Sequence, residues 1–109
     1  MEITEIIIGL NECQKAYLRE NDYTNECFFN GEELTKEYTF VLKEGKKYKR
    51  IDCFNRGVFM VDEEGELYNI KGYGVIDKNK KLKANLGNIK DYNSENIREL
   101  FKRQFNYLR

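Results

Sequence analysis

The sequence predicts an α+β domain in which an antiparallel β-meander lies between an N-terminal and a C-terminal helix. Residues 40–77 contain three strand-like runs that are separated by two short turns containing glycine. Residues 4–20 and 94–109 instead repeat apolar side chains at the spacing of one helical face. A chain of 109 residues supports one hydrophobic core, so we expect one domain with a strongly bent sheet of five or six strands.

The meander is expected to contribute three consecutive neighbouring strands. The first run, residues 46–54, is followed by a three-residue turn in which Gly57 can take the positive φ of a bulged hairpin. Residues 58–61 are uninterruptedly apolar, which predicts a central strand that is buried on both faces. An acidic turn at residues 62–65 then leads into a third strand over residues 67–70.

Residues 4–20 are predicted to form the N-terminal helix. Thr4 is the expected N-cap, and Glu5 would interact favourably with the positive end of the helix dipole. Three consecutive isoleucines and the glycine after them are poor helix formers, so an edge strand over residues 2–8 is the alternative.

The segment between this helix and the meander contains two signals. Residues 21–25 are rich in Asn, Asp and Thr, which end helices, and Asn30-Gly31 is the dipeptide most typical of a two-residue hairpin turn. In residues 36–42, Tyr38, Phe40 and Leu42 occupy every second position, which predicts a strand that leads into the meander.

After the meander, residues 75–77 and 82–86 are predicted to pair across a lysine-rich turn. The C-terminal helix is expected to be capped by Asn93 or Ser94. Its apolar stripe consists of Ile97, Leu100, Phe101, Phe105 and Leu108. We expect this stripe to cover the sheet, and a homodimer through residues 94–109 is the alternative use.

The residue types present argue against catalysis. Histidine is absent and Ser94 is the only serine, so the usual triads that activate a hydroxyl cannot be assembled. Cys13, Cys27 and Cys53 are too widely spaced for a zinc site, and we expect reduced, buried thiols. No phosphate-binding glycine motif or calcium loop occurs, so we expect no enzyme activity, no metal and no cofactor.

Apolar runs are far shorter than the roughly twenty residues that span a membrane. Because the N-terminus also lacks a basic start, we expect a cytoplasmic protein that does not interact with membranes. The net charge of zero conceals an asymmetry: residues 1–44 carry −6 and residues 45–109 carry +6. The two halves either attract each other in the fold or form patches for different partners.

A protein partner is the first functional hypothesis. Several glutamates lie near or beside aromatic residues in the acidic half, and together they predict an acidic, aromatic face that docks on a basic protein. The candidate binding residues are Glu26, Glu32, Glu33, Glu37 and Glu44, near Tyr23, Phe28, Phe29, Tyr38 and Phe40. In the alternative interpretation, the aromatic residues form the core and the glutamates face water.

Nucleic-acid binding is the second hypothesis. Basic residues occur among the predicted strands and hairpins together with Tyr48, Phe54 and Tyr73, a mixture that can neutralise phosphates and stack on bases. The candidate residues are Lys46, Lys47, Lys49, Arg50, Tyr73, Lys78, Lys80, Lys81 and Lys83. A sequence pI of about 6.4 is low for a dedicated nucleic-acid module.

Two segments carry a resemblance to known proteins. A glycine precedes a tyrosine-containing strand in LKEGKKYKRID, and an acidic turn ends in glycine in VDEEGELY, within residues 42–68. This pattern resembles the opening strands of small SH3-like barrels of phages and Gram-positive mobile elements. The resemblance implies an SH3-like sheet and a role in binding protein or nucleic acid. Size and composition are also similar to those of small accessory proteins that inhibit a host protein by occupying its surface.

Overall fold

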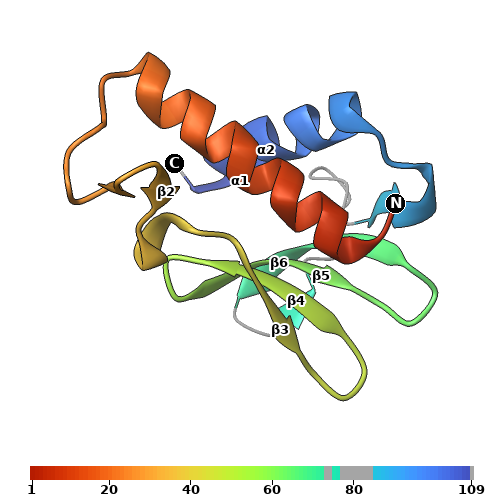
Figure 1. Cartoon of the computed structure of the whole chain (residues 1–109). Coiled ribbons are helices and arrows are strands. Elements are labelled where there is room, and N and C mark those ends of the chain that lie inside the picture. The colour runs from red at the N-terminus through yellow and green to blue at the C-terminus, as the bar shows by residue number, and fades with distance from the viewer. Residues whose placement is uncertain (73–74, 77–84, 109) are drawn as a thin grey trace.

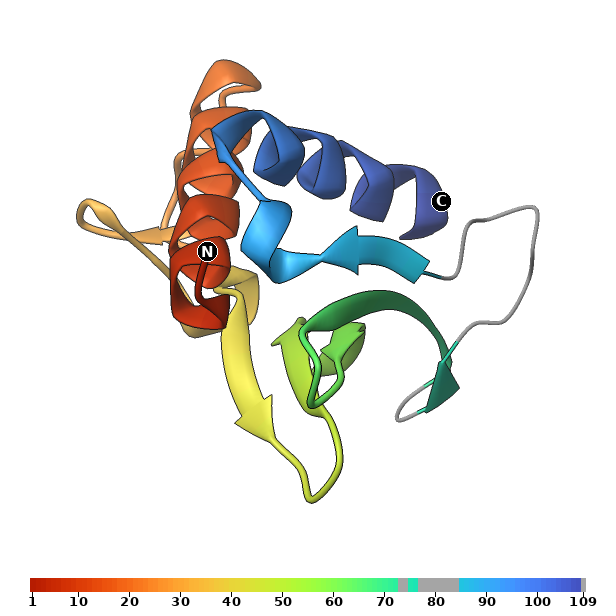
Figure 2. The same cartoon turned by 90° about the vertical axis from the view of Figure 1, so that its right-hand side faces the viewer.

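Two helices lie on one side of an antiparallel sheet, so the molecule has two layers (Figure 1; Figure 2). Helix α1 spans Ile3–Glu20 and helix α2 spans Ser94–Leu108, near the two ends of the chain. The prediction of an α+β fold with an N-terminal and a C-terminal helix is therefore confirmed.

The computed structural model describes the backbone of residues 1–72, 75–76 and 85–108, and the side chains of residues 1–70 and 86–103. Five residues proposed for nucleic-acid binding therefore lie outside the described residues: Tyr73, Lys78, Lys80, Lys81 and Lys83. Within the described part of the chain, neither helix has the length and apolar character needed to cross a membrane.

Within the described residues, six antiparallel strands form the main sheet in the order β3-β4-β5-β6-β7, and β8 also pairs with β6. Their bounds are β3 Val41–Glu44, β4 Lys49–Cys53, β5 Arg56–Val61, β6 Glu66–Gly72, β7 Val75–Ile76 and β8 Asn85–Asn88. The three neighbouring strands of the predicted meander are confirmed as β4, β5 and β6. In the described part the sheet is open, because β3 pairs only with β4.

The predicted pairing of residues 75–77 with 82–86 falls largely on residues 77–84, which lie outside the described residues. Strand β7 pairs Ile76 with Ile70, and β8 pairs Asn85 with Tyr68, so both strands use β6 as their partner. Strand β6 is seven residues long and therefore offers enough backbone for both short strands.

The turn between β4 and β5 consists of Phe54 and Asn55 alone, because Cys53 pairs with Arg56. Both turn residues have positive φ, 59° and 60°, as a type I′ turn requires. The predicted three-residue turn with Gly57 at positive φ is wrong. Gly57 instead lies within the ladder at the register shift of β4.

A small separate hairpin, β1 (Phe29–Asn30) with β2 (Glu33–Leu34), confirms the hairpin expected at this place. Its turn residues are Gly31 and Glu32, one position later than the predicted Asn30-Gly31, because Asn30 pairs with Glu33. Gly31 has φ +66° at the first central position, which a type II′ turn reserves for glycine.

The strand predicted over residues 36–42 is wrong in its first half. Lys36–Tyr38 forms a 3-10 helix, η1, and β3 begins only at Val41. The physical reason is α1. Its Asn11 side chain donates to the Phe40 carbonyl (3.1 Å) and accepts from the Phe40 N–H (2.7 Å), and Gln14 Nε2 donates to the Tyr38 carbonyl (3.2 Å). These side chains satisfy backbone groups that a neighbouring strand would otherwise satisfy.

Helix α1 confirms the predicted N-terminal helix, and the alternative edge strand is wrong. Its N-cap is Glu2 rather than Thr4, because Glu2 and Glu5 form a reciprocal capping box. At the other end Asp22 has φ 60° and the Tyr23 N–H bonds the Leu18 carbonyl at 2.8 Å, which is a Schellman motif.

Helices α1 and α2 pack on each other above the sheet. A Cβ on Gly9 would lie only 2.8 Å from Ile97 Cδ1, so glycine permits this close approach. Asn93 caps α2, since its side chain accepts from the Asn96 N–H (3.0 Å) and Asn96 bonds back to the Asn93 N–H (3.0 Å).

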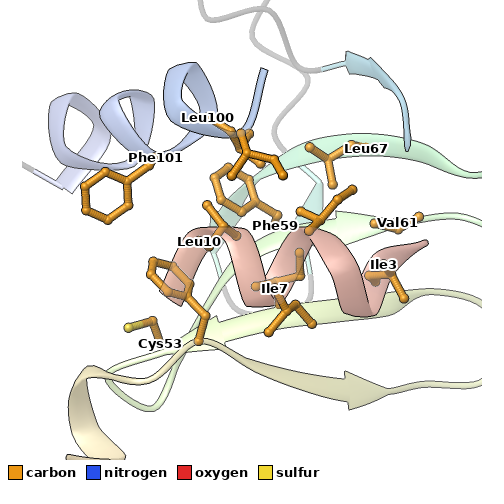
Figure 3. Packing of buried hydrophobic residues seen from close by; sticks show 13 residues of the cluster. Ile3, Ile7, Leu10, Cys53, Phe59, Val61, Leu67, Leu100 and Phe101 are labelled. Atoms are coloured by element: carbon orange, nitrogen blue, oxygen red, sulfur yellow. The ribbon is translucent and has the colours of Figure 1, made fainter. Parts of the chain in front are cut away.

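The core lies between the helices and the sheet. Figure 3 shows Ile7 and Leu10 of α1 and Leu100 of α2 pointing toward Phe59 and Leu67 of the sheet. The described part of the α2 stripe, Ile97, Leu100 and Phe101, is buried, so it covers the sheet as expected. The side chains of Phe105 and Leu108 lie outside the described ones.

Candidate functional site

Four aromatic rings form a continuous row that reaches the surface, and we call this row the aromatic ridge: Tyr23, Phe28, Tyr38 and Phe54. Successive ring centroids are 5.3, 4.7 and 4.6 Å apart, which is the spacing of favourably packed aromatic pairs. The two end rings are exposed, Tyr23 by 47% and Phe54 by 40%, and the two middle rings are half-buried. Contiguous exposed apolar side chains mark interaction surfaces, whereas scattered ones do not.

Backbone hydrogen bonds join the segments that carry the ridge. The Phe54 N–H bonds the Glu37 carbonyl at 3.2 Å, which fixes the β4–β5 turn against η1. The Thr35 N–H bonds the Phe28 carbonyl at 2.9 Å, and the Thr35 hydroxyl donates to the Cys27 carbonyl at 2.9 Å. The four rings are therefore held by residues far apart in sequence.

Helix α1 supports the β1–β2 hairpin, which lies next to the ridge in sequence. The Arg19 guanidinium lies 5.1 Å from the centre of the Phe29 ring and donates to the Glu32 carbonyl at 3.3 Å. Lys15 forms a salt bridge of 3.6 Å with Glu33. A surface fixed in this way loses little conformational freedom when it binds a partner.

Phe54 is held in a conformation that a bulky residue rarely adopts. Its φ of 59° lies in the left-handed region, where a Cβ approaches the following carbonyl. The ring is nevertheless 40% exposed and packs edge-on against Tyr38. Backbone strain that presents an apolar ring at the surface is typical of functional positions.

The segment that carries Tyr23, Phe28 and Tyr38 is strongly acidic, whereas the Phe54 turn is followed by the exposed Arg56. Residues 20–38 carry six acidic side chains and one lysine. Of the predicted binding residues, Glu26 lies in the chain between Tyr23 and Phe28, and Glu37 adjoins Tyr38; both are exposed. Among the described residues neither of these two glutamates forms a salt bridge, so their charges are available to a partner.

The other three predicted glutamates are placed differently. Glu32 and Glu33 are exposed on the β1–β2 hairpin, and Glu33 is paired with Lys15. Glu44 ends β3, next to the β3–β4 turn, and so does not belong to the ridge. Four of the five glutamates thus belong to the 20–38 segment, which also carries three ridge residues, and Glu44 lies outside it.

Two aromatic residues expected on this face lie in the interior. Phe29 is 7% exposed and Phe40 is 1% exposed, so the alternative interpretation, in which the aromatic residues form the core, holds for these two. Phe54 takes their place on the surface. Sequence reasoning grouped Phe54 with the lysines, whereas the structure packs it on Tyr38.

The described basic candidates lie on and beside the β3–β4 hairpin. Lys46 and Lys47 form its two-residue turn, closed by a 3.0 Å bond from the Gly45 N–H to the Tyr48 carbonyl. Lys49 is exposed, and Arg50 is half-buried with its Nε 4.0 Å from Asp52. This turn precedes β4 and the Phe54 turn follows it, so the lysines and the ridge occupy opposite ends of one strand.

A hollow of about 250 Å³ lies between the β3–β4 and β5–β6 turns. Its lining includes Lys46, Lys47 and Lys49 but also Glu2 and Glu63, so charges of both signs surround it. The volume is slightly below that of ordinary ligand sites, about 300–1,000 Å³.

The cysteines differ from one another in the structure. Cys53 is buried at 2% exposure, and burial raises the pKa of its thiol to about 12. Burial also raises the pKa of the half-buried Cys13. Cys27 is exposed beside Phe28, so the expectation of a buried thiol is wrong there. Within the described residues, His, Cys, Asp and Glu side chains form no group that could hold a metal ion.

A comparison of the chain with family models, with curated proteins and with solved structures found no match.

Proposed function

We propose that the protein is a non-enzymatic binding module whose aromatic ridge occupies a basic segment of a protein partner. The row of four packed rings with exposed ends carries this proposal. Aromatic residues are enriched among the few residues that dominate the binding energy of protein interfaces, and acidic side chains around them attract cationic partners. Guanidinium and ammonium groups also bind directly to tyrosine faces.

The charge around the ridge favours protein over nucleic acid. Exposed rings would stack on bases, but the acidic residues of the 20–38 segment repel phosphates. The second candidate, an SH3-like nucleic-acid-binding protein that uses lysine-rich hairpins, is supported by the exposed lysines Lys46, Lys47 and Lys49.

We also propose that the bent sheet is SH3-like and that the protein acts in the cytoplasm. In this proposal the protein is a phage or mobile-element accessory protein that inhibits a host protein by covering its surface. The aromatic ridge alone would be sufficient for this kind of inhibition. No catalytic residue is required for inhibition by occupation of a surface.

The experiment is a fluorescence anisotropy titration at low salt with three labelled probes: a twelve-residue Arg-Ser repeat peptide, the matching Glu-Ser peptide and a mixed-sequence single-stranded oligonucleotide. We expect binding of the Arg-Ser peptide only. Phe54→Ala should weaken that binding by about tenfold, which corresponds to about 1.4 kcal/mol. Ile8→Ala is the matched control, because Ile8 is 62% exposed on α1 and outside the ridge.

A second pair of variants separates local charge from total charge. Glu26→Lys with Glu37→Lys and Glu63→Lys with Glu64→Lys change the net charge equally, and all four residues are exposed. We expect the first pair to abolish peptide binding and the second to leave most of it. Equal losses would show that the peptide senses net charge alone, and preferential oligonucleotide binding would favour the second candidate.

A further inference from the structure

The chain carries two oppositely charged surfaces that cannot meet each other within one molecule. The hairpin tip, residues 45–49, carries three exposed lysines, and three of the four ridge residues lie in the acidic segment, residues 20–38. Residues 50–53 of β4 separate the tip from Phe54, which is roughly 13 Å of extended backbone. Figure 1 and Figure 2 both show the β3–β4 hairpin projecting from the body, away from the segment between α1 and β3.

The hairpin-tip lysines Lys46, Lys47 and Lys49 have no carboxylate partner in the part of the chain that the structure describes. The Lys47 ammonium lies 5.6 Å from the centre of the neighbouring Tyr48 ring, which shows that an aromatic face already accepts this cation. The turn at the end of the tip has only two residues, Lys46 and Lys47, so a row of rings can contact both from one side.

We propose that the aromatic ridge of one copy receives the hairpin tip of a second copy, head to tail. This inference rests on the proposed function, because it uses the same ridge. Lysine ammonium groups of the tip would lie against Tyr23 and Phe54, with Glu26 and Glu37 as counter-charges. The chain's formal net charge of zero removes the overall repulsion that keeps like-charged proteins apart.

The two contacting surfaces differ from each other, so the contact is heterologous. Each added copy brings one free ridge and one free tip, and such contacts extend into open chains unless the rotation closes a ring. A basic partner segment would compete with the tip for the ridge. Self-association and partner binding are therefore mutually exclusive at each ridge.

The test measures the weight-average mass by sedimentation at low salt with two variants, one that removes charge from the tip and one that removes rings from the ridge. The tip variant is Lys46→Ser with Lys47→Ser, and the ridge variant is Tyr23→Ala with Phe54→Ala. We expect the mass of the wild type to rise with concentration from 13.1 kDa to more than twice that value and to fall with added salt.

We expect each variant alone to stay monomeric and their equimolar mixture to stop at a dimer, because only one good ridge and one good tip remain per pair. Lys90→Ser with Lys102→Ser is the matched control; it removes the same charge from exposed positions elsewhere and should assemble like the wild type.

A wild type that stays monomeric, or a mixture that stays monomeric, would overturn the head-to-tail contact. The tip variant should still bind the Arg-Ser peptide. If it binds the peptide while the wild type never self-associates, only this inference fails. If no ridge binds the peptide, the proposed function fails as well.

Discussion

Tyr38 and Phe40 lie two residues apart on one segment, yet they belong to different regions of the molecule. Phe40 is 1% exposed and its ring packs 6.4 Å from Phe101 in the core. Tyr38 points the other way and packs between Phe28 and Phe54 on the ridge. Aromatic residues of one short segment therefore have two roles: Phe40 stabilises the core, and Tyr38 is available to bind a partner.

The core and the ridge also differ in how their rings are held. In the core, Asn11 of α1 fixes the Phe40 backbone with two hydrogen bonds, and the buried ring packs among aliphatic side chains and the Phe101 ring. On the ridge, ring packs on ring, and the terminal Phe54 is presented by a turn with unfavourable φ. Disrupting the core should therefore cost stability, whereas disrupting the ridge should cost binding.

The largest difference is expected in thiol reactivity. Cys27 adjoins the ridge residue Phe28 and is exposed, whereas Cys53 is buried with its thiol pKa raised to about 12. A protein of about 5 kcal/mol stability exposes its core in about one molecule per several thousand, so Cys53 should react with a disulfide reagent at least about 1,000-fold more slowly. Stopped-flow absorbance follows the reaction with the reagent, and the Cys27→Ser and Cys53→Ser variants show which kinetic phase belongs to which thiol. Similar rates would contradict the burial of Cys53.

The same thiol predicts a pH dependence. The folded-state pKa of Cys53 is raised from its ordinary value of 9.0 to about 12, so its stabilising contribution is complete below pH 9. Between pH 9 and 12 the unfolded chain releases a proton that the folded chain keeps, and the free energy of unfolding falls. Urea titrations should show a smaller alkaline loss in Cys53→Ala than in the wild type.

Truncation of a core ring should have the largest effect on stability. Phe40→Ala is expected to lower the free energy of unfolding by about 3–5 kcal/mol, because it leaves a cavity among the buried side chains. Phe54→Ala, the ridge counterpart, should lower it by less than about 1 kcal/mol, since the ring is partly solvated. Urea denaturation measures both. Equal losses would mean that the ridge is part of the folding core.

Removal of the Asn11 side chain should have an intermediate effect. Asn11→Ala leaves the Phe40 N–H and carbonyl without their side-chain partner, which should cost about 1–3 kcal/mol. Asn25→Ala is the control beside the ridge, because its side chain accepts one exposed bond from the Cys27 N–H, and we expect a loss below about 1 kcal/mol. A larger loss at Asn25 would contradict the role of α1 in orienting residues 38–40.

The smallest effect on stability is expected at the strained turn. Phe54→Gly relieves the cost of positive φ, about 1 kcal/mol, and removes the exposed ring. Stability should therefore stay within about 1 kcal/mol of the wild type while binding of the Arg-Ser peptide weakens. Asn55→Gly relieves the neighbouring φ and keeps the ring, so it should retain binding. A collapse of stability in Phe54→Gly would show that the ring is structural.

The sequence predicted the elements well wherever periodicity alone decides them. Both helices, the three neighbouring strands β4, β5 and β6, and the hairpin near Gly31 follow from local patterns. The errors occur where tertiary contacts decide. Hydrogen bonds from Asn11 and Gln14 of α1 hold residues 38–40, where the segment begins as η1 instead of a strand. The pairing of β4 with β5 places their turn on Phe54 and Asn55, although neither residue is a glycine.

The sequence indicated that acidic and aromatic residues form the candidate site, but it did not indicate which aromatic residues reach the surface. Acidic and aromatic residues were grouped correctly for Tyr23, Phe28 and Tyr38, because they are close in sequence. Phe28 and Phe29 are adjacent and similar, and no local pattern decides which of them faces α1. Phe54 joins the ridge through a hydrogen bond to Glu37 and a ring contact to Tyr38, 16 or more residues away.

The most direct test of the aromatic ridge is an NMR titration of the ¹⁵N-labelled protein with the Arg-Ser peptide, in which every backbone amide reports separately. We expect the saturable shifts to concentrate in residues 22–38 and at Phe54 and Asn55. The shifts of residues 45–49 should change only because the peptide displaces this hairpin tip from the ridge of another copy. Saturable shifts confined to residues 45–49, or no saturable shift anywhere, would contradict this expectation.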